Sequence, residues 1–151
     1  MRRVAVSACL LGCSCRYDGR DNLNNTLLEQ LKSYEIISFC PEDFCFSTPR
    51  PTMDLIKRAN DVVAVSNETN RDLSEPILQY AYDFFNQYSE IELFIGKDRS
   101  PSCGVKSAKV YDAQKNLIST NGTGLMAKVA LELGIVCWDS EVYMATHNHT
   151  S

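Results

Sequence analysis

Short apolar runs rich in valine and isoleucine alternate with longer segments of helical periodicity along this chain of 151 residues. Strands that alternate with helices form βαβ units, whose sheets are mostly parallel and covered by helices on both faces. The pattern therefore predicts one α/β domain over residues 1–151, with a patternless tail from about residue 141. We expect strands at 2–8, 34–39, 61–66, 91–96 and 135–140, a β excursion at 107–120, and helices at 22–33, 75–88 and 123–133.

The composition excludes several classes of partner. Fifteen Lys and Arg residues against nineteen Asp and Glu residues give a net charge of −4, so we expect no basic surface for a nucleic-acid polymer. No stretch approaches the roughly 18 to 20 consecutive apolar residues of a membrane span, and the apolar run at 4–11 lacks a cleavage site. We therefore expect a cytoplasmic protein that binds a small molecule. The sequence does not indicate an oligomeric state.

Seven cysteines need an explanation in a chain with this composition. Their odd number and the expected reducing compartment argue against a disulfide framework. Cys137 lies within an apolar strand-like run and is predicted to be an inert core thiol. The other six lie in three segments that follow expected strands and contain helix-breaking residues: Cys9, Cys13, Cys15, Cys40, Cys45 and Cys103.

The positions of these six thiols predict a common site. Parallel strands end at one edge of their sheet, so the loops that carry Cys9, Cys40, Cys45 and Cys103 should open onto the same crevice. Thiolates from separate loops suit an iron–sulfur cluster or a soft metal ion. Zinc is the weaker alternative, because no C-x-x-C pair is present and the histidines lie only in the tail, within "HNH" at 147–149.

Four polar features have more than one interpretation. Glu42 could relay protons beside a cluster or be a solvated loop acid. Arg50 of "TPRP" and Arg16 of "CRYDG" could bind an anion or cover apolar surface. Gly122 and Gly124 precede an expected helix whose N-terminus could receive a phosphate or carboxylate.

Three motifs in this order resemble a known family: "SACLLGCSCRYDG", "CPE" followed by "TPRP", and "SPSCG". The family comprises small bacterial proteins, some of which are thiouracil desulfidases, and the resemblance extends to about residue 140. It implies a three-layer Rossmann-like domain that carries a [4Fe-4S] cluster on three cysteines, with one iron left open. It also implies the non-redox, hydrolytic desulfuration of a thiolated nucleobase, of the 2- or 4-thiouracil type, with release of sulfide.

The same resemblance implies roles for individual residues. The cluster ligands would be Cys9, Cys45 and Cys103, with Cys40 or Cys15 as substitutes for Cys45 at the middle position. The catalytic residues would be Glu42 and Ser100.

Two functions of other classes remain open at this point. In a non-catalytic metal or cluster module, a fourth thiol such as Cys15 would close the coordination sphere. In a thiol redox protein, Cys13, Cys15 or Cys40 would form a reversible disulfide without a metal. The number of cysteines bound to the metal distinguishes a catalytic site from a structural one. Three cysteines leave one position open for a substrate, whereas four close the coordination sphere.

Overall fold

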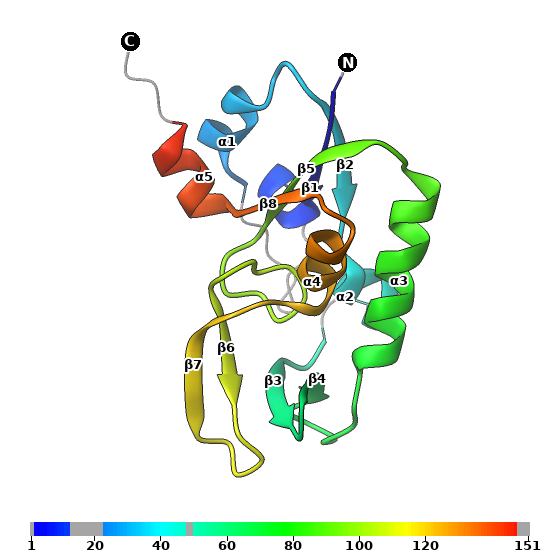
Figure 1. Ribbon diagram of the computed structural model, residues 1–151, viewed down its shortest axis with the longest axis vertical. Helices are drawn as coiled ribbons and strands as arrows, with labels where there is room; N and C mark the ends of the chain where they lie inside the picture. Colours follow the sequence, from blue (N-terminus) through cyan, green and yellow to red (C-terminus); the bar gives the residue numbers. More distant parts are fainter. Residues whose placement is uncertain (1, 13–22, 48–49, 148–151) are drawn as a thin grey trace.

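The computed structural model describes residues 2–12, 23–47 and 50–147. Figure 1 shows the arrangement of its elements. In chain order they are β1 (Arg3–Ser7), the short 3-10 helix η1 (Ala8–Leu11), α1 (Asn25–Gln30), β2 (Glu35–Phe39), α2 (Pro41–Phe46), β3 (Met53–Arg58), β4 (Asp61–Ser66), α3 (Ser74–Gln87), β5 (Ile91–Gly96), β6 (Ala108–Tyr111), β7 (Leu117–Gly122), α4 (Leu125–Glu132), β8 (Val136–Asp139) and α5 (Ser140–Thr146).

A parallel sheet forms the centre of the fold, with its strands in the order β2-β1-β5-β8. Successive side chains of a strand point to opposite faces, so Val4 and Val6 pack with Leu27 of α1 and Tyr143 of α5. Ala5 points the other way, into a cluster formed with α3 and α4. Helices therefore cover both faces, which confirms the predicted α/β fold with three layers.

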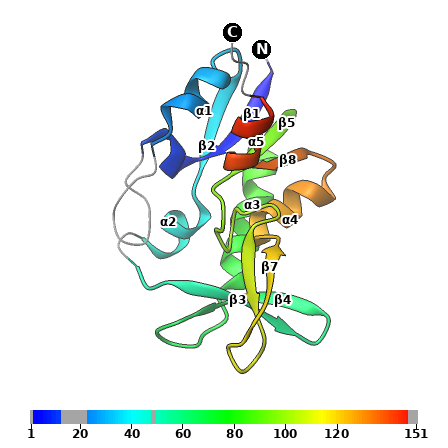
Figure 2. The same cartoon turned by 90° about the vertical axis from the view of Figure 1, so that its left-hand side faces the viewer.

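A second sheet lies beyond the first, with its strands in the order β4-β3-β6-β7 (Figure 2). The strand expected at 61–66 is β4, which belongs to this sheet and runs antiparallel to β3. The sequence prediction missed β3 itself. Only Ala59 and Asn60 separate β3 from β4, whereas a parallel connection needs roughly a dozen residues or more. The two strands can therefore pair only as a hairpin, and Ala59 makes its turn with a positive φ of 53°.

The helix ends differ in detail from the expected ones. The side chain of Asn24 caps α1 by accepting a hydrogen bond from Leu27 N, and the expected helix start at residue 22 lies outside the described residues. α3 begins one residue before the expected start at 75, with Ser74, whose hydroxyl accepts a hydrogen bond from Ala64 N at 2.8 Å. This contact ties α3 to β4.

The segment predicted to be a tail contains the helix α5. Its first turn is held by Asp98, whose Oδ1 accepts hydrogen bonds from Ser140 Oγ and Glu141 N. Because Asp98 is 42 residues earlier in the chain than Ser140, local sequence pattern could not reveal this cap. The prediction of a patternless tail was wrong as far as His147, which is the C-cap of α5.

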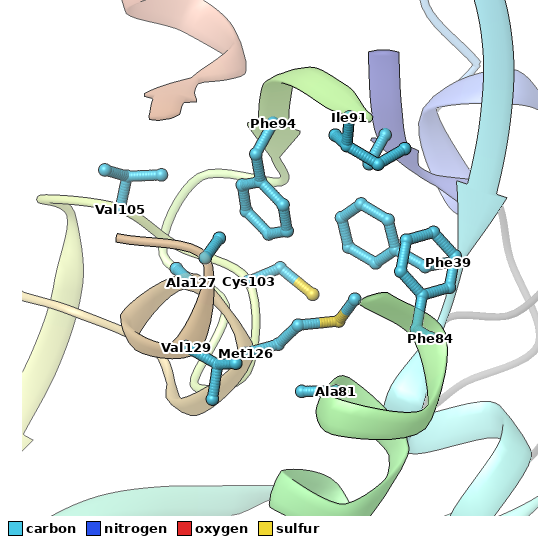
Figure 3. Close-up of a cluster of buried hydrophobic side chains, with 12 residues drawn as sticks. Phe39, Ala81, Phe84, Ile91, Phe94, Cys103, Val105, Met126, Ala127 and Val129 are labelled. Carbon is cyan, nitrogen blue, oxygen red and sulfur yellow. The ribbon is translucent and has the colours of Figure 1, made fainter. Parts of the chain in front are cut away.

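Aromatic side chains fill the core between the parallel sheet and helices α3 and α4 (Figure 3). The rings of Phe39 and Phe94 stack with centroids 4.8 Å apart, and Phe84 meets Phe39 edge-on at 5.7 Å. The sulfur of Cys103 points into this cluster beside Met126 (Figure 3). Across the part of the chain that the structure describes, no helix has the length and apolarity that a membrane crossing requires.

Candidate functional site

A pocket of about 480 Å³ opens at the carboxyl ends of β1, β2 and β5. Three segments line it, as the sequence predicted: one after β1, one after β2 and one after β5. Its lining residues are Ser7, Ala8, Cys9, Phe39, Cys40, Pro41, Glu42, Arg50, Lys97, Asp98, Arg99, Ser100, Pro101 and Cys103.

Three thiols share this pocket. Cys9 lies on η1, Cys40 occupies the N-cap position of α2, and Cys103 lies in the loop after β5. Cys45, the middle ligand implied by the resemblance, lies on α2 outside the pocket lining, and its Sγ donates to Pro76 O at 3.4 Å. The structure therefore places Cys40, rather than Cys45, beside the other two thiols. Cys13 and Cys15 lie outside the described residues.

Burial dominates the acid–base properties of two of these cysteines. It raises the pKa of Cys103 well above its ordinary value, and the neighbouring Cys40, Glu42 and Cys9 raise it further, while a hydrogen bond with Ser7 opposes them. Burial also raises the pKa of Cys45, and the neighbouring Cys40 and Glu42 raise it further by smaller amounts. A thiol held in its neutral form needs a compensating cation to become a ligand, which iron supplies.

The soft sulfur donors of this pocket suit an iron–sulfur cluster. Among the described residues, no three Cys, His, Asp or Glu side chains form a site for one metal ion. A cluster distributes its thiolate ligands over several iron atoms, so its ligands need not converge on one point. Soft sulfur donors from separate loops, at the edge of one pocket, are the arrangement that such a cluster takes.

Glu42 is held by two side chains at the edge of this pocket. Its Oε2 accepts a hydrogen bond from Ser102 Oγ at 2.9 Å, and its Oε1 lies 3.6 Å from Arg50 Nε. The Glu42 and Arg50 side chains are only 16% and 5% exposed. Glu42 is therefore not a solvated loop acid, and Arg50 is the buried counter-ion of this carboxylate.

Ser100 organises the turn that carries Cys103. Its Oγ accepts hydrogen bonds from Ser102 N at 3.2 Å and from Cys103 N at 3.1 Å. A serine hydroxyl can accept two bonds and still donate one. Since Ser100 also lines the pocket, its hydrogen can be donated to a bound molecule.

The N-terminus of α4 holds this same loop. Leu125 N donates to Pro101 O at 3.1 Å, and Met126 N donates to Ser102 O at 2.8 Å. The suggested anion site at Gly122 and Gly124 was therefore wrong, because loop carbonyls occupy these amides. Gly124 instead permits a close approach: a Cβ there would lie 2.4 Å from the carbonyl carbon of Ser102.

Comparisons with known proteins now place this site in context. A family described as 2-thiouracil desulfurase matches residues 4–141. The chain belongs to this family. YbbK of Bacillus subtilis (strain 168), described as uncharacterized, is 27% identical over 139 residues, which cover 87% of this chain and 91% of YbbK. Among solved structures, the [4Fe-4S]-dependent thiouracil desulfidase TudS superposes with a TM-score of 0.76 and 25% identity, covering 97% of each chain.

Two residues of this member of the 2-thiouracil desulfurase family acquire roles that the sequence did not indicate. The Tyr80 hydroxyl accepts a hydrogen bond from Cys40 N at 3.1 Å. Burial raises the pKa of Tyr80 to about 12, and nearby cysteines add to the effect, so its hydroxyl stays protonated beside the pocket. Ser7 accepts a bond from Lys97 N at 2.9 Å and joins the ends of β1 and β5. Their partners lie 40 and 90 residues away, so no local signal reveals them.

Asp139, at the end of β8, holds the chain just after Cys103. Its carboxylate accepts hydrogen bonds from Val105 N, Lys106 N and Ser107 Oγ, at 2.7 to 2.8 Å. Asp139 is 5% exposed, so removing it would leave buried donors without an acceptor.

We expect Asp139→Ala to lower the free energy of unfolding by about 3 kcal/mol or more, because each bond to a charged acceptor contributes substantially. Urea denaturation of the apoprotein measures this loss. Asp112→Ala is the matched control, since Asp112 also accepts backbone bonds, from Gln114 N and Asn116 N, but in an exposed turn. Equal losses in the two variants would contradict the role of Asp139.

Cys137, the predicted core thiol, lies on β8 and packs against the aromatic core. Its Sγ donates to Ile135 O at 3.2 Å, and burial raises its pKa to about 12. It does not line the pocket, so it serves below as a control for the pocket thiols.

Proposed function

We propose that this protein hydrolyses the carbon–sulfur double bond of a thiolated nucleobase, of the 2- or 4-thiouracil type, at a [4Fe-4S] cluster. The observation that carries the proposal is the presence of three thiols and the held carboxylate of Glu42 in one pocket. Membership of the 2-thiouracil desulfurase family and the likeness to a [4Fe-4S]-dependent thiouracil desulfidase support it.

The cluster would be held by three thiolates. Cys9 and Cys103 supply two of them, because both line the pocket and both match the family motifs. For the third, the place in the motif favours Cys45, whereas the pocket geometry favours Cys40; Cys15, the other alternative, lies outside the described residues. When bound there, such a cluster would supply a thiophilic Lewis acid that polarises the carbon–sulfur bond of the substrate.

The chain's own residues would then move the protons. Glu42, as a carboxylate, accepts a proton from a water molecule whose oxygen attacks the electron-poor carbon. Arg50 remains beside Oε1 and balances the carboxylate charge before this transfer. The hydroxyl of Ser100 lines the pocket and donates a hydrogen bond that orients the base or the water.

The reaction balances without a redox partner. Water contributes its oxygen to the carbon, and the sulfur leaves as sulfide with the protons that the water carried. The carbon keeps its oxidation state, because its two bond pairs to sulfur are replaced by two bond pairs to oxygen. Neither an electron donor nor an acceptor is therefore required.

Anaerobic reconstitution followed by an activity assay tests this function. We expect about four iron and four acid-labile sulfide per chain, and conversion of 2- or 4-thiouracil, or of their nucleosides or nucleotides, to the oxygen form with release of sulfide. Loss of the near-ultraviolet absorbance of the thiouracil and a direct sulfide assay report turnover. A cluster-loaded protein that releases no sulfide from any of these compounds would exclude the function, and stoichiometric zinc without iron would exclude the cluster.

A further inference from the structure

The second serine of "SPSCG" contacts the catalytic carboxylate, although the function assigned above uses only the first. Ser102 is fully buried, with 0% exposure, and its Oγ donates to Glu42 Oε2 at 2.9 Å. The two residues are 60 positions apart in the chain and meet only because the loops after β2 and β5 converge. Ser102 does not line the pocket, so it does not touch a bound molecule.

The backbone on both sides of the Ser102 hydroxyl is fixed. Its amide donates to Ser100 Oγ at 3.2 Å, and its carbonyl accepts bonds from Met126 N at 2.8 Å and Ala127 N at 3.2 Å. Gly124 packs directly against its carbonyl carbon. The hydroxyl is therefore presented to Glu42 from a rigid support.

Glu42, by contrast, lies on a weak support. It is in the first turn of α2, a helix of only six residues, and isolated helices of this length are marginal. A glutamate side chain loses rotamer entropy when it is fixed, so it needs a directional partner. The 3.6 Å separation from Arg50 Nε is an ion pair without hydrogen-bond geometry, whereas the bond from Ser102 is short and directional.

We propose that Ser102 is a positioning residue that fixes the Glu42 carboxylate in the orientation needed to accept a proton in the pocket. The two serines of the motif then have separate tasks. Ser100 contacts the bound molecule and shapes the turn, and Ser102 acts only through Glu42. The effect on turnover rests on the proposed function, whereas the effect on the Glu42 side chain does not.

Ser102→Ala in the reconstituted protein tests the effect on turnover. We expect kcat to fall between about tenfold and a hundredfold, the effect of misplacing a catalytic group by about 1 Å, while KM and iron content stay unchanged. In a Glu42→Gln background, Ser102→Ala should not lower kcat further, because Ser102 affects turnover only by orienting the Glu42 carboxylate. Unchanged kcat, loss of the cluster, or an equal loss in both backgrounds would each overturn the proposal.

A crystal structure of Ser102→Ala tests the positioning without any assay. We expect the Glu42 carboxylate to leave its wild-type position or to occupy several rotamers, while the main chain at 100–104 stays in place. A carboxylate unchanged in position would overturn the proposal, even if the wild-type protein proved inactive. Wild-type activity decides the proposed function separately.

Ser74→Ala provides the matched control. Ser74 is also a buried serine, 9% exposed, whose hydroxyl makes one short bond, to Ala64 N, but it lies at the second sheet. We expect a comparable loss of stability by urea denaturation and no change in kcat. A similar fall of kcat in Ser74→Ala would show that general destabilisation, rather than the contact with Glu42, lowers turnover.

Discussion

Replacement of Cys9 or Cys103 by serine is expected to abolish cluster binding, with iron falling from about four per chain to near zero. Both thiols are almost fully enclosed, at 9% and 6% exposure, and both line the pocket. With one thiolate removed, only two of the three proposed protein ligands would remain to hold the cluster. Iron and sulfide analysis after anaerobic reconstitution, together with the visible absorption spectrum, measures the loss.

Cys40→Ser and Cys45→Ser identify the third ligand in the same experiment. The variant that loses the cluster marks the ligand, and the other should keep about four iron atoms per chain. If both keep the cluster, a thiol outside the described residues, Cys13 or Cys15, takes the position. Cys40 lines the pocket, whereas Cys45 lies outside the lining and its Sγ donates to Pro76 O, so the pocket geometry predicts that Cys40→Ser is the variant that loses the cluster.

Cys137→Ser is the control for these variants. Its thiol packs against the core and lies outside the pocket lining, so the change should reduce stability and leave the iron content intact. Iron loss in Cys137→Ser equal to that in Cys103→Ser would mean that destabilisation, and not ligation, explains the result.

Glu42→Gln is expected to lower kcat by about 10²- to 10⁴-fold while the cluster remains bound, the range for a lost general base. The amide has nearly the same shape as the carboxylate and can still accept the bond from Ser102 Oγ. It cannot take a proton from water at neutral pH, so the attack on the carbon loses its base. Sulfide release under saturating thiouracil measures kcat, and iron analysis shows that the cluster is retained.

Asp43→Asn is the matched control for this variant. Asp43 follows Glu42 in the first turn of α2 but does not line the pocket. We expect its turnover to stay close to that of the wild-type protein. A loss of cluster in Glu42→Gln would assign Glu42 to the structure of the site, and full activity would remove it from the mechanism.

Local pattern was sufficient to predict the parallel sheet. The central strands β1 and β5 are short apolar runs, as a strand buried on both faces must be, and the less buried edge strands β2 and β8 are short runs of the same kind. The convergence of Cys9 and Cys103 followed from the same pattern, because parallel strands end at one edge. The sequence also contains the motifs that place the chain in its family.

The elements that the sequence did not reveal depend on distant partners. α5 begins where Asp98 accepts hydrogen bonds from Ser140 Oγ and Glu141 N. α2 begins at Pro41, after the N-cap Cys40, whose amide donates to the Tyr80 hydroxyl. β3 pairs with β4 on one side and with β6 on the other. A short segment gains too little from its own hydrogen bonds to be stable alone, so tertiary contacts select its conformation.

The sequence by itself determined the fold class, the edge of the sheet at which the thiols meet and the residues available there. Only the tertiary structure decided which of them face one another: Cys40 rather than Cys45 lines the pocket, Arg50 pairs with Glu42, and Ser102 orients the same carboxylate. The spacing of apolar residues within a single helix or strand is enough to predict which of its residues are buried. The direction of a polar side chain depends on a partner 60 residues away, which only the packed chain brings within 2.9 Å.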